Sequence, residues 1–349
     1  MKTYRHVTGK IVLLGIGKLL WFVVLACAAC IWITDAVCQD KNRARVSILL
    51  ATGMHGSTYY HVGLAMASLW TTRLRDAGIR VSAASSEGSM ENIEAIRIAD
   101  ADMIIAEDLF CSMAAAGNGL FKGKPLPELR SITALWPDVL QIVIRSDKMH
   151  KGTLQDLDGI ALATGLPDSG NKYILELLLK SMKNEKPKVR FRPMSNQAAV
   201  EALKKGLVDG IDVTGGVPVP LLSSLLQDGK ISLGFLEISG AQMEAAREEG
   251  WKNVFPTVVP AGSYPGQDKA IHTVGHANLL AVTASLSPEI VYLLTKTLYE
   301  NLEYLMKVHP ACRTMSLEKA LDGVNVPLHR GSVRYYKEKK IKVPERLIQ

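Results

Sequence analysis

The sequence predicts a two-lobed α/β protein in which parallel-rich sheets are flanked by helices and a ligand cleft lies between the lobes. From residue 46, short apolar runs alternate with longer stretches of helical period, and the alternation restarts after residue 140. Strand, helix and strand in succession imply parallel pairing. The chain has 349 residues, of which 48% are hydrophobic, and this is enough material for two packed lobes.

The first forty residues differ in composition from the rest of the chain. Basic residues precede an apolar run over 11–33, which is the order found in export signals. Cleavage is expected near Ala36-Val37-Cys38, with a lipoprotein-like site at 24–27 as a weaker candidate. An uncleaved membrane anchor is the alternative. We therefore expect residues 1–38 to be a signal peptide or an anchor and the mature protein to be periplasmic.

Charge and cysteine content exclude several classes of function. Removing residues 1–38 takes away four basic residues and one acid, which lowers the net charge from +7 to +4. This small excess does not indicate a nucleic-acid partner. Cys111 and Cys312 lie far apart, without the spacing of a metal or redox site. We expect them to be buried thiols, and we expect no cofactor and no metal.

The first lobe is predicted to comprise residues 45–140 together with 276–349. Its strands are expected at 46–51, 81–84, 103–106 and 277–283, and its helices at 58–76 and from residue 90. Ser287-Pro288-Glu289 combines a capping hydroxyl, a proline in the first turn and an acid that interacts favourably with the helix dipole. A helix is therefore predicted from this point toward Met306, ending before Pro310.

The second lobe is predicted to comprise residues 141–275. Its strands are expected at 160–163, 189–191, 210–214 and 231–236, and its helices at 171–181 and 197–205. The apolar strands at 140–145 and 277–283 would each leave one sheet and enter the other. Such strands form a hinge, and a cleft between the lobes would hold the ligand.

Four loops rich in glycine and hydroxyl residues follow predicted strands in the two lobes. The carboxyl ends of parallel strands face a shared crevice, and backbone N–H groups at a helix start suit a carboxylate. Each loop alone is equally well an ordinary capped turn, but four of them favour a binding site. The candidate ligand residues are His55, Ser57, Tyr59, Tyr60, Ser89, Asn92, Ser169, Gly170, Asn171, Thr214, Gly215, Gly216 and Pro218.

Glu107-Asp108 ends the third predicted strand and is the most unusual local feature. Two acids at the mouth of a cleft repel a solute carboxylate unless they meet a cation or are protonated. Asp108 is more simply explained as a helix-start acid. For Glu107 we expect a ligand role, in which its carboxylate accepts a hydrogen bond from an amine or another donor of the solute.

Catalytic signatures are missing from the sequence. It contains neither a Gly-x-Ser-x-Gly elbow nor a His-Glu-x-x-His motif, and its histidines are scattered. His55 stands in a candidate loop without an evident nucleophile or base beside it. We therefore expect no catalytic residue and no enzymatic activity.

Six segments resemble the TAXI family of TRAP-transporter solute receptors. They are GSTYY at 56–60, GSMEN at 88–92, FKGKP at 121–125, PAGSYPGQD at 260–268, TVG at 273–275 and PLHRGSVRYY at 327–336. The resemblance implies a two-lobed periplasmic-binding-protein fold (type II-like). It also implies a small organic-acid solute, glutamate-like, dicarboxylate or another amino or organic acid, which is delivered to TRAP membrane permease subunits.

The sequence departs from this family's pattern at Met54-His55, at Glu107, and at Asp168 and Asn171, which puts glutamate itself in doubt as the solute. The loop at 264–268 is expected to brace the hinge rather than touch the ligand. A monomer suits a clamp that docks by both lobes. A membrane-anchored sensor is the rival binding function, and an isomerase or hydrolase on the same scaffold is the rival enzyme.

Overall fold

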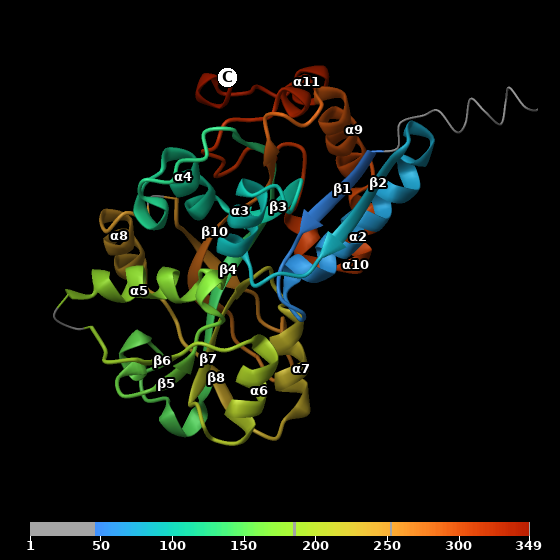
Figure 1. The fold of residues 1–349 in the computed structure, drawn as a ribbon. Coiled ribbons are helices and arrows are strands. Elements are labelled where there is room, and N and C mark those ends of the chain that lie inside the picture. Colours follow the sequence, from blue (N-terminus) through green and yellow to red (C-terminus); the bar gives the residue numbers. More distant parts are fainter. Residues whose placement is uncertain (1–45, 184–185, 252, 349) are drawn as a thin grey trace, which may run out of the picture. The chain divides into compact units, whose positions relative to one another are not determined.

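Ten strands in the part of the chain that the structure describes form one continuous sheet (Figure 1). The structure is a computed structural model that describes residues 46–183, 186–251 and 253–348. The order across the sheet is β2-β1-β3-β10-β4-β7-β5-β6, with β8 paired to β4 and β9 to β10. The strands are β1 Val46–Ala51, β2 Ile79–Ala84, β3 Met103–Glu107, β4 Leu129–Arg145, β5 Ala161–Ala163, β6 Arg190–Arg192, β7 Gly210–Gly215, β8 Leu233–Phe235, β9 Phe255–Val259 and β10 Ile271–Thr283.

Helices cover the sheet, and several begin at the capping residues that the sequence provides. Ser57, Ser195 and Ser239 each accept a backbone N–H from the first turn of the helix that follows. The helices are α2 Thr58–Arg73, α3 Ser89–Arg97, α4 Asp108–Ala116, α5 Asn171–Ser181, α6 Asn196–Lys204, α7 Pro220–Asp228, α8 Gly240–Glu248, α9 Pro288–Tyr299, α10 Leu302–Val308 and α11 Arg330–Glu338. Among the described residues, no helix is both long enough and apolar enough to cross a membrane.

The predicted fold class is confirmed. Strand β1 pairs parallel with β3, and β5 pairs parallel with β6 and β7. Strands β4 and β10 are long and run antiparallel to their neighbours, and β4 pairs first with β10 and then with β7. This continuity is what the sequence predicted for a type II-like binding-protein fold. The lobe boundaries 45–140 with 276–349 and 141–275 stay a prediction, and residues 1–38 lie outside the described residues.

Two elements differ from the sequence prediction. Strand β4 begins at Leu129, upstream of the predicted 140, because Pro137 is accommodated close to a register irregularity between β4 and β10. The helix predicted toward Met306 is two helices, α9 and α10. The Asn301 side chain donates to the Thr297 carbonyl at 2.8 Å, so a side-chain bond takes the place of a backbone bond at the break.

The core is built from large apolar side chains on the sheet and the helices that cover it. Trp70, Trp136 and Trp251 are fully buried. The Trp70 indole on α2 donates to the Leu294 carbonyl on α9 at 2.9 Å, which joins these two helices. Cys111 and Cys312 are free, buried thiols, as predicted.

The loop after β9 is anchored by one buried tyrosine. The Tyr264 hydroxyl donates to the side-chain oxygen of Gln141 on β4 and accepts the Val219 backbone N–H at 2.8 Å. The Gln267 side chain donates to the Pro260 and Lys269 carbonyls within the same loop. These contacts agree with the expectation that this segment is a structural brace.

We predict that Tyr264→Phe lowers the free energy of unfolding by about 1–3 kcal/mol, because a buried donor and a buried acceptor lose their partner. Urea denaturation measures this change. The control is Tyr304→Phe, whose side chain is 41% exposed and which should change stability by less than about 0.5 kcal/mol. Equal effects of the two substitutions would show that the hydroxyl of Tyr264 does not brace the loop.

Asp156 holds the turn between β4 and β5. Its carboxylate accepts the backbone N–H groups of His150, Lys151 and Gly152, each at 2.8 Å. Burial alone would raise the pKa of Asp156, but these three donors outweigh it and the pKa is lowered. The carboxylate form therefore stabilises the folded state.

We predict that Asp156→Asn destabilises the protein by about 1 kcal/mol at pH 7, since it loses charge-assisted hydrogen bonds that water partly screens. The pKa of Asp156 is lower in the folded than in the unfolded chain, so this stabilisation is complete above the unfolded value of about 4 and is lost as the pH falls through the folded value. The measurement is urea denaturation at several pH values, with the exposed Asp322→Asn as control. A difference between wild type and variant that is as large at pH 3 as at pH 7 contradicts the assignment.

Candidate functional site

A cavity of about 40 Å³ lies where loops that follow β1, β2, β5 and β7 come together. It brings together eight of the candidate residues, from both series of strands. They are Ser57, Tyr59, Ser89, Glu107, Ser169, Asn171, Thr214 and Gly215. The lining also includes residues that the sequence analysis did not propose, namely Gly53, Met54, Thr58, Glu87, Gly88, Asp138, Asn196, Val213 and Val219.

Six candidate residues lie outside the cavity lining. His55 is exposed and its ring packs against that of Tyr60, with centroids 4.3 Å apart. Asn92 is buried and donates to the carbonyls of Thr52 and Ile105, so it joins the ends of β1 and β3. The other four are Tyr60, Gly170, Gly216 and Pro218.

Close packing explains why glycine is present at positions 170 and 216. A Cβ atom on Gly170 would stand 2.5 Å from the Phe110 ring, and one on Gly216 would stand 2.4 Å from Trp136. Gly170 also has a φ of +91°, in the region that favours glycine. The ligand role of all six remains a prediction.

The hydroxyl groups around the cavity differ in what they already bind. Ser57 caps α2 by accepting the Tyr60 N–H, and the Ser89 hydroxyl accepts the Glu107 N–H at 3.1 Å. Ser169 donates to the Leu166 carbonyl. The Thr214 hydroxyl is buried without a hydrogen-bond partner. Of these four, Thr214 is therefore the one whose hydroxyl a ligand would satisfy.

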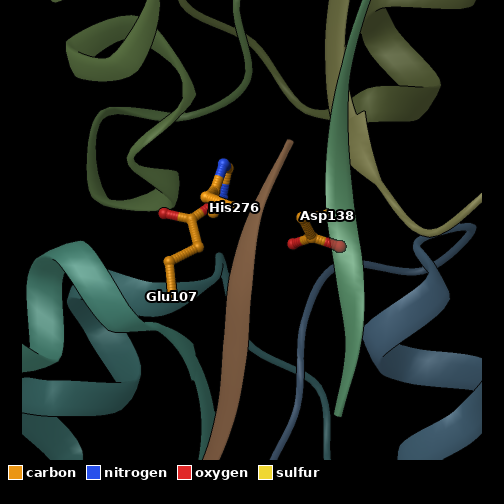
Figure 2. Close-up of side chains that lie close together, drawn as sticks. All are labelled: Glu107, Asp138 and His276. Carbon is orange, nitrogen blue, oxygen red and sulfur yellow. The ribbon is translucent and has the colours of Figure 1, made fainter. Parts of the chain in front are cut away.

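Below the loops, one face of the sheet carries a cluster of ionisable side chains. Strand β10 is hydrogen-bonded between β3 and β4, and its register sets His276 opposite Asp138 and Asn278 opposite Glu107. Directly opposed residues of antiparallel strands point to the same face. Glu107 and His276 lie close together, with Asp138 on the neighbouring strand β4 (Figure 2). The three are at most 3% exposed.

The contacts within this cluster leave several polar atoms unsatisfied. The Nε2 atom of His276 lies 3.4 Å from a Glu107 oxygen. The second Glu107 oxygen and both ring nitrogens of His276 are buried without a well-formed hydrogen bond. On the adjoining β7, both carboxylate oxygens of Asp212 are also buried and unpartnered. Buried groups of this kind cost free energy unless something binds them.

Burial and mutual charge perturb the acid–base properties of the cluster. Burial raises the pKa of Asp138 to about 6; Glu107 adds to this rise and His276 opposes it. Burial, together with Glu107, raises the pKa of Asp212 well above its usual range. Burial lowers the pKa of His276, but Glu107 and the neighbouring acids outweigh this and the net shift is upward. The electrostatics of the cluster therefore favour a positive charge beside Glu107.

A hydrogen-bonded frame holds the cluster in place. The Tyr59 hydroxyl donates to the Asn278 side chain, whose amide donates to the Trp136 carbonyl at 3.0 Å. The Trp136 indole donates to an oxygen of Asp138 at 3.2 Å. Tyr59 comes from the first candidate loop, so this frame connects the loop to the floor of the site.

The sequence analysis found Glu107 but missed Asp138, Asp212 and His276. Each of the three is an ionisable residue inside an otherwise apolar strand, and this pattern could have identified them. These positions lie within strands, whereas the predicted ligand residues lie mainly in loops at strand ends. The histidines were described as scattered, and His276 meets Glu107 only through the pairing of β10 with β3.

The chain resembles several solved structures at low sequence identity. With a protein from Bordetella bronchiseptica RB50 it shares 18% identity over 86% of this chain and 90% of that chain, at a TM-score of 0.47. With the alkanesulfonate-binding protein SsuA from Xanthomonas axonopodis pv. citri bound to MOPS, the chain shares 15% identity over 86% of this chain and 96% of that chain, at a TM-score of 0.44. With an ancestral arginine-binding protein bound to arginine, the chain shares 13% identity over 77% of this chain and 95% of that chain, at a TM-score of 0.45.

A family model gives a match over most of the chain. The model of the NMT1-like family matches residues 50–339, which include every loop of the cavity and all strands of the sheet from β2 to β10. The chain therefore belongs to the NMT1-like family.

Proposed function

We propose that this chain is an extracytoplasmic solute receptor that binds a small organic acid in the cavity and performs no chemistry on it. The observation that carries the proposal is the cavity itself, whose lining comes from loops of both strand series. Binding residues on loops held by a rigid sheet are typical of receptor sites. The solute class is an amino acid, a dicarboxylate or a related organic acid.

The polar groups of the lining support a solute with an acid group at one end. Helices α2, α3 and α5 begin beside the cavity, and the N-terminus of a helix favours negative charge. The unpartnered Thr214 hydroxyl offers a further hydrogen bond. The loops therefore offer hydrogen-bond donors to an acid group of the solute.

Opposite these loops, Glu107 and Asp138 also reach the cavity, and two carboxylates require a positive counter-charge. An amine on the solute is the counter-charge expected for Glu107, and a cation bound with the solute would serve equally. A solute anion without either would be repelled.

The size of the cavity bears on how a solute enters. A volume of about 40 Å³ accommodates roughly two or three water molecules, which is less than an amino acid requires. We therefore propose that the described conformation is nearly closed and that the loops separate to admit the solute. Strands β4 and β10 would act as the hinge.

The transport system is the finer part of the proposal. The six segments that resemble TAXI receptors support delivery of the solute to TRAP-type permease subunits by a periplasmic monomer. Residues 1–38 would serve as the export signal or anchor. Neither nucleic acid nor a cofactor belongs to this function.

The proposal predicts that an organic acid raises the melting temperature of the purified full-length chain, because a ligand that binds only the folded protein stabilises it. A thermal-shift screen against amino acids, dicarboxylates and other organic acids measures this. Repeating it with nucleotides and sugars tests selectivity. A response to sugars or nucleotides, with none to any acid, would contradict the proposed solute class.

Thr214→Val tests the cavity directly. Removing an unsatisfied buried hydroxyl should leave stability unchanged or increase it, whereas affinity for the solute should fall by about threefold to tenfold with the lost hydrogen bond. Thr164→Val is the matched control, since its hydroxyl is likewise buried and unpartnered but does not line the cavity. Isothermal titration calorimetry with the best solute of the screen gives both affinities. Equal losses, or none in Thr214→Val, would place the solute elsewhere.

A further inference from the structure

The cluster at the floor of the cavity has more acceptors than an organic acid alone can use. We propose that Glu107, Asp138 and His276 bind a divalent transition-metal ion, Zn²⁺ or Mn²⁺, and that the acid group of the solute completes its coordination. The part concerning the solute rests on the proposed function. The metal site itself rests on the geometry of the cluster.

Three donors converge on one region from three strands. One ligand atom from each of Glu107, Asp138 and His276 lies within 4.8 Å of the others, so small side-chain rotations would place them around one ion. Two carboxylates and one imidazole suit Zn²⁺ or Mn²⁺ better than Mg²⁺ or Ca²⁺, which prefer oxygen ligands throughout.

The unsatisfied atoms point to a missing ligand. The second Glu107 oxygen and both nitrogens of His276 are buried without a hydrogen-bond partner, although His276 lies 3.4 Å from Glu107. A metal ion would bind a Glu107 oxygen and one of the two His276 nitrogens in place of a proton. Its double charge would also balance the two carboxylates.

One carboxylate of the site already has an outer hydrogen bond. Metal-binding carboxylates are usually hydrogen-bonded by a further shell of residues. The Asp138 carboxylate accepts the Trp136 indole N–H at 3.2 Å. Ser89 accepts the backbone N–H of Glu107 at 3.1 Å, which fixes the main chain at this ligand. The donors are therefore oriented by the strands and by their neighbours.

The space beside the cluster is large enough for an ion. Glu107 and Asp138 line a cavity of about 40 Å³, which accommodates an ion with one or two water molecules. An open coordination position facing the cavity would bind a carboxylate of the solute. The charge of the ion would then offset the repulsion between that carboxylate and those of Glu107 and Asp138.

The first test uses the wild-type chain and needs no variant. Protein treated with EDTA and returned to metal-free buffer is titrated with Zn²⁺, Mn²⁺, Mg²⁺ or Ca²⁺ alone, and bound Mn²⁺ is followed by the loss of its free electron paramagnetic resonance signal. We expect one equivalent of Mn²⁺ or Zn²⁺ to bind and to raise the melting temperature by about 5 °C at a hundredfold excess over Kd. Absence of a stoichiometric site for both ions would overturn the proposal.

Variants then locate the site. His276→Gln and Asp138→Asn should each weaken metal binding by at least about tenfold, and using two variants protects the test if one fails to fold. The matched control is His272→Gln, an exposed histidine on the same strand β10, which should bind metal like wild type. Unchanged binding in both cluster variants would overturn the assignment to these residues.

Adding solute separates this inference from the proposed function. We expect acids found in the screen to bind at least about tenfold more tightly with the metal than after EDTA treatment. Equal binding after EDTA treatment, lost in Glu107→Gln, would support a solute amine and overturn the metal-bridged complex. Metal binding without a response to any acid would support the metal site and count against the proposed solute.

Discussion

The pairing of β10 between β3 and β4 is the constraint on which the site depends. Its hydrogen bonds fix a register in which His276 faces Asp138 and Asn278 faces Glu107. A slip of one residue would turn His276 and Asn278 to the opposite face of the sheet, and the cluster would no longer form. The same strand continues to β9, and β4 continues to β7. The two strands that assemble the floor of the cavity are therefore also the ones that join the two series of elements.

Burying this cluster is costly, and the surrounding structure reduces that cost only in part. An isolated buried ion carries a penalty of several kcal/mol, and here one ligand atom from each of three ionisable groups lies within 4.8 Å of the others. Tyr59, Asn278 and Trp136 form hydrogen bonds that orient Asp138 and the strand ends. The Asp212 carboxylate and one Glu107 oxygen stay unpartnered. Apolar residues at the positions of Asp212 and Glu107 would make the protein more stable. We therefore attribute the presence of these carboxylates to function.

Much of the fold was predictable because local patterns and tertiary structure agree. Strand β1 was predicted at its observed bounds, and the helix predicted from residue 58 begins there as α2. The start of β4 was missed because Pro137 and Asp138 interrupt its apolar run, and only pairing with β10 makes that stretch a strand. The site was predictable where residues follow strand ends, as with Ser169, Asn171 and Thr214. Asp138 and His276 are separated by more than a hundred residues of sequence. Local sequence patterns contain no information about the β4–β10 register that pairs them.

The central claim is that a solute binds in the cavity above this cluster, and a crystal structure of the protein with the best acid of the screen tests it most directly. The account predicts density for the solute between the Thr214 loop and Glu107, with its acid group toward the helix starts or a bound ion. Anomalous data at the zinc or manganese edge would show any ion in the same crystal. Solute density on another surface, with the Thr214 hydroxyl and the Glu107 carboxylate still unpartnered, would contradict the account.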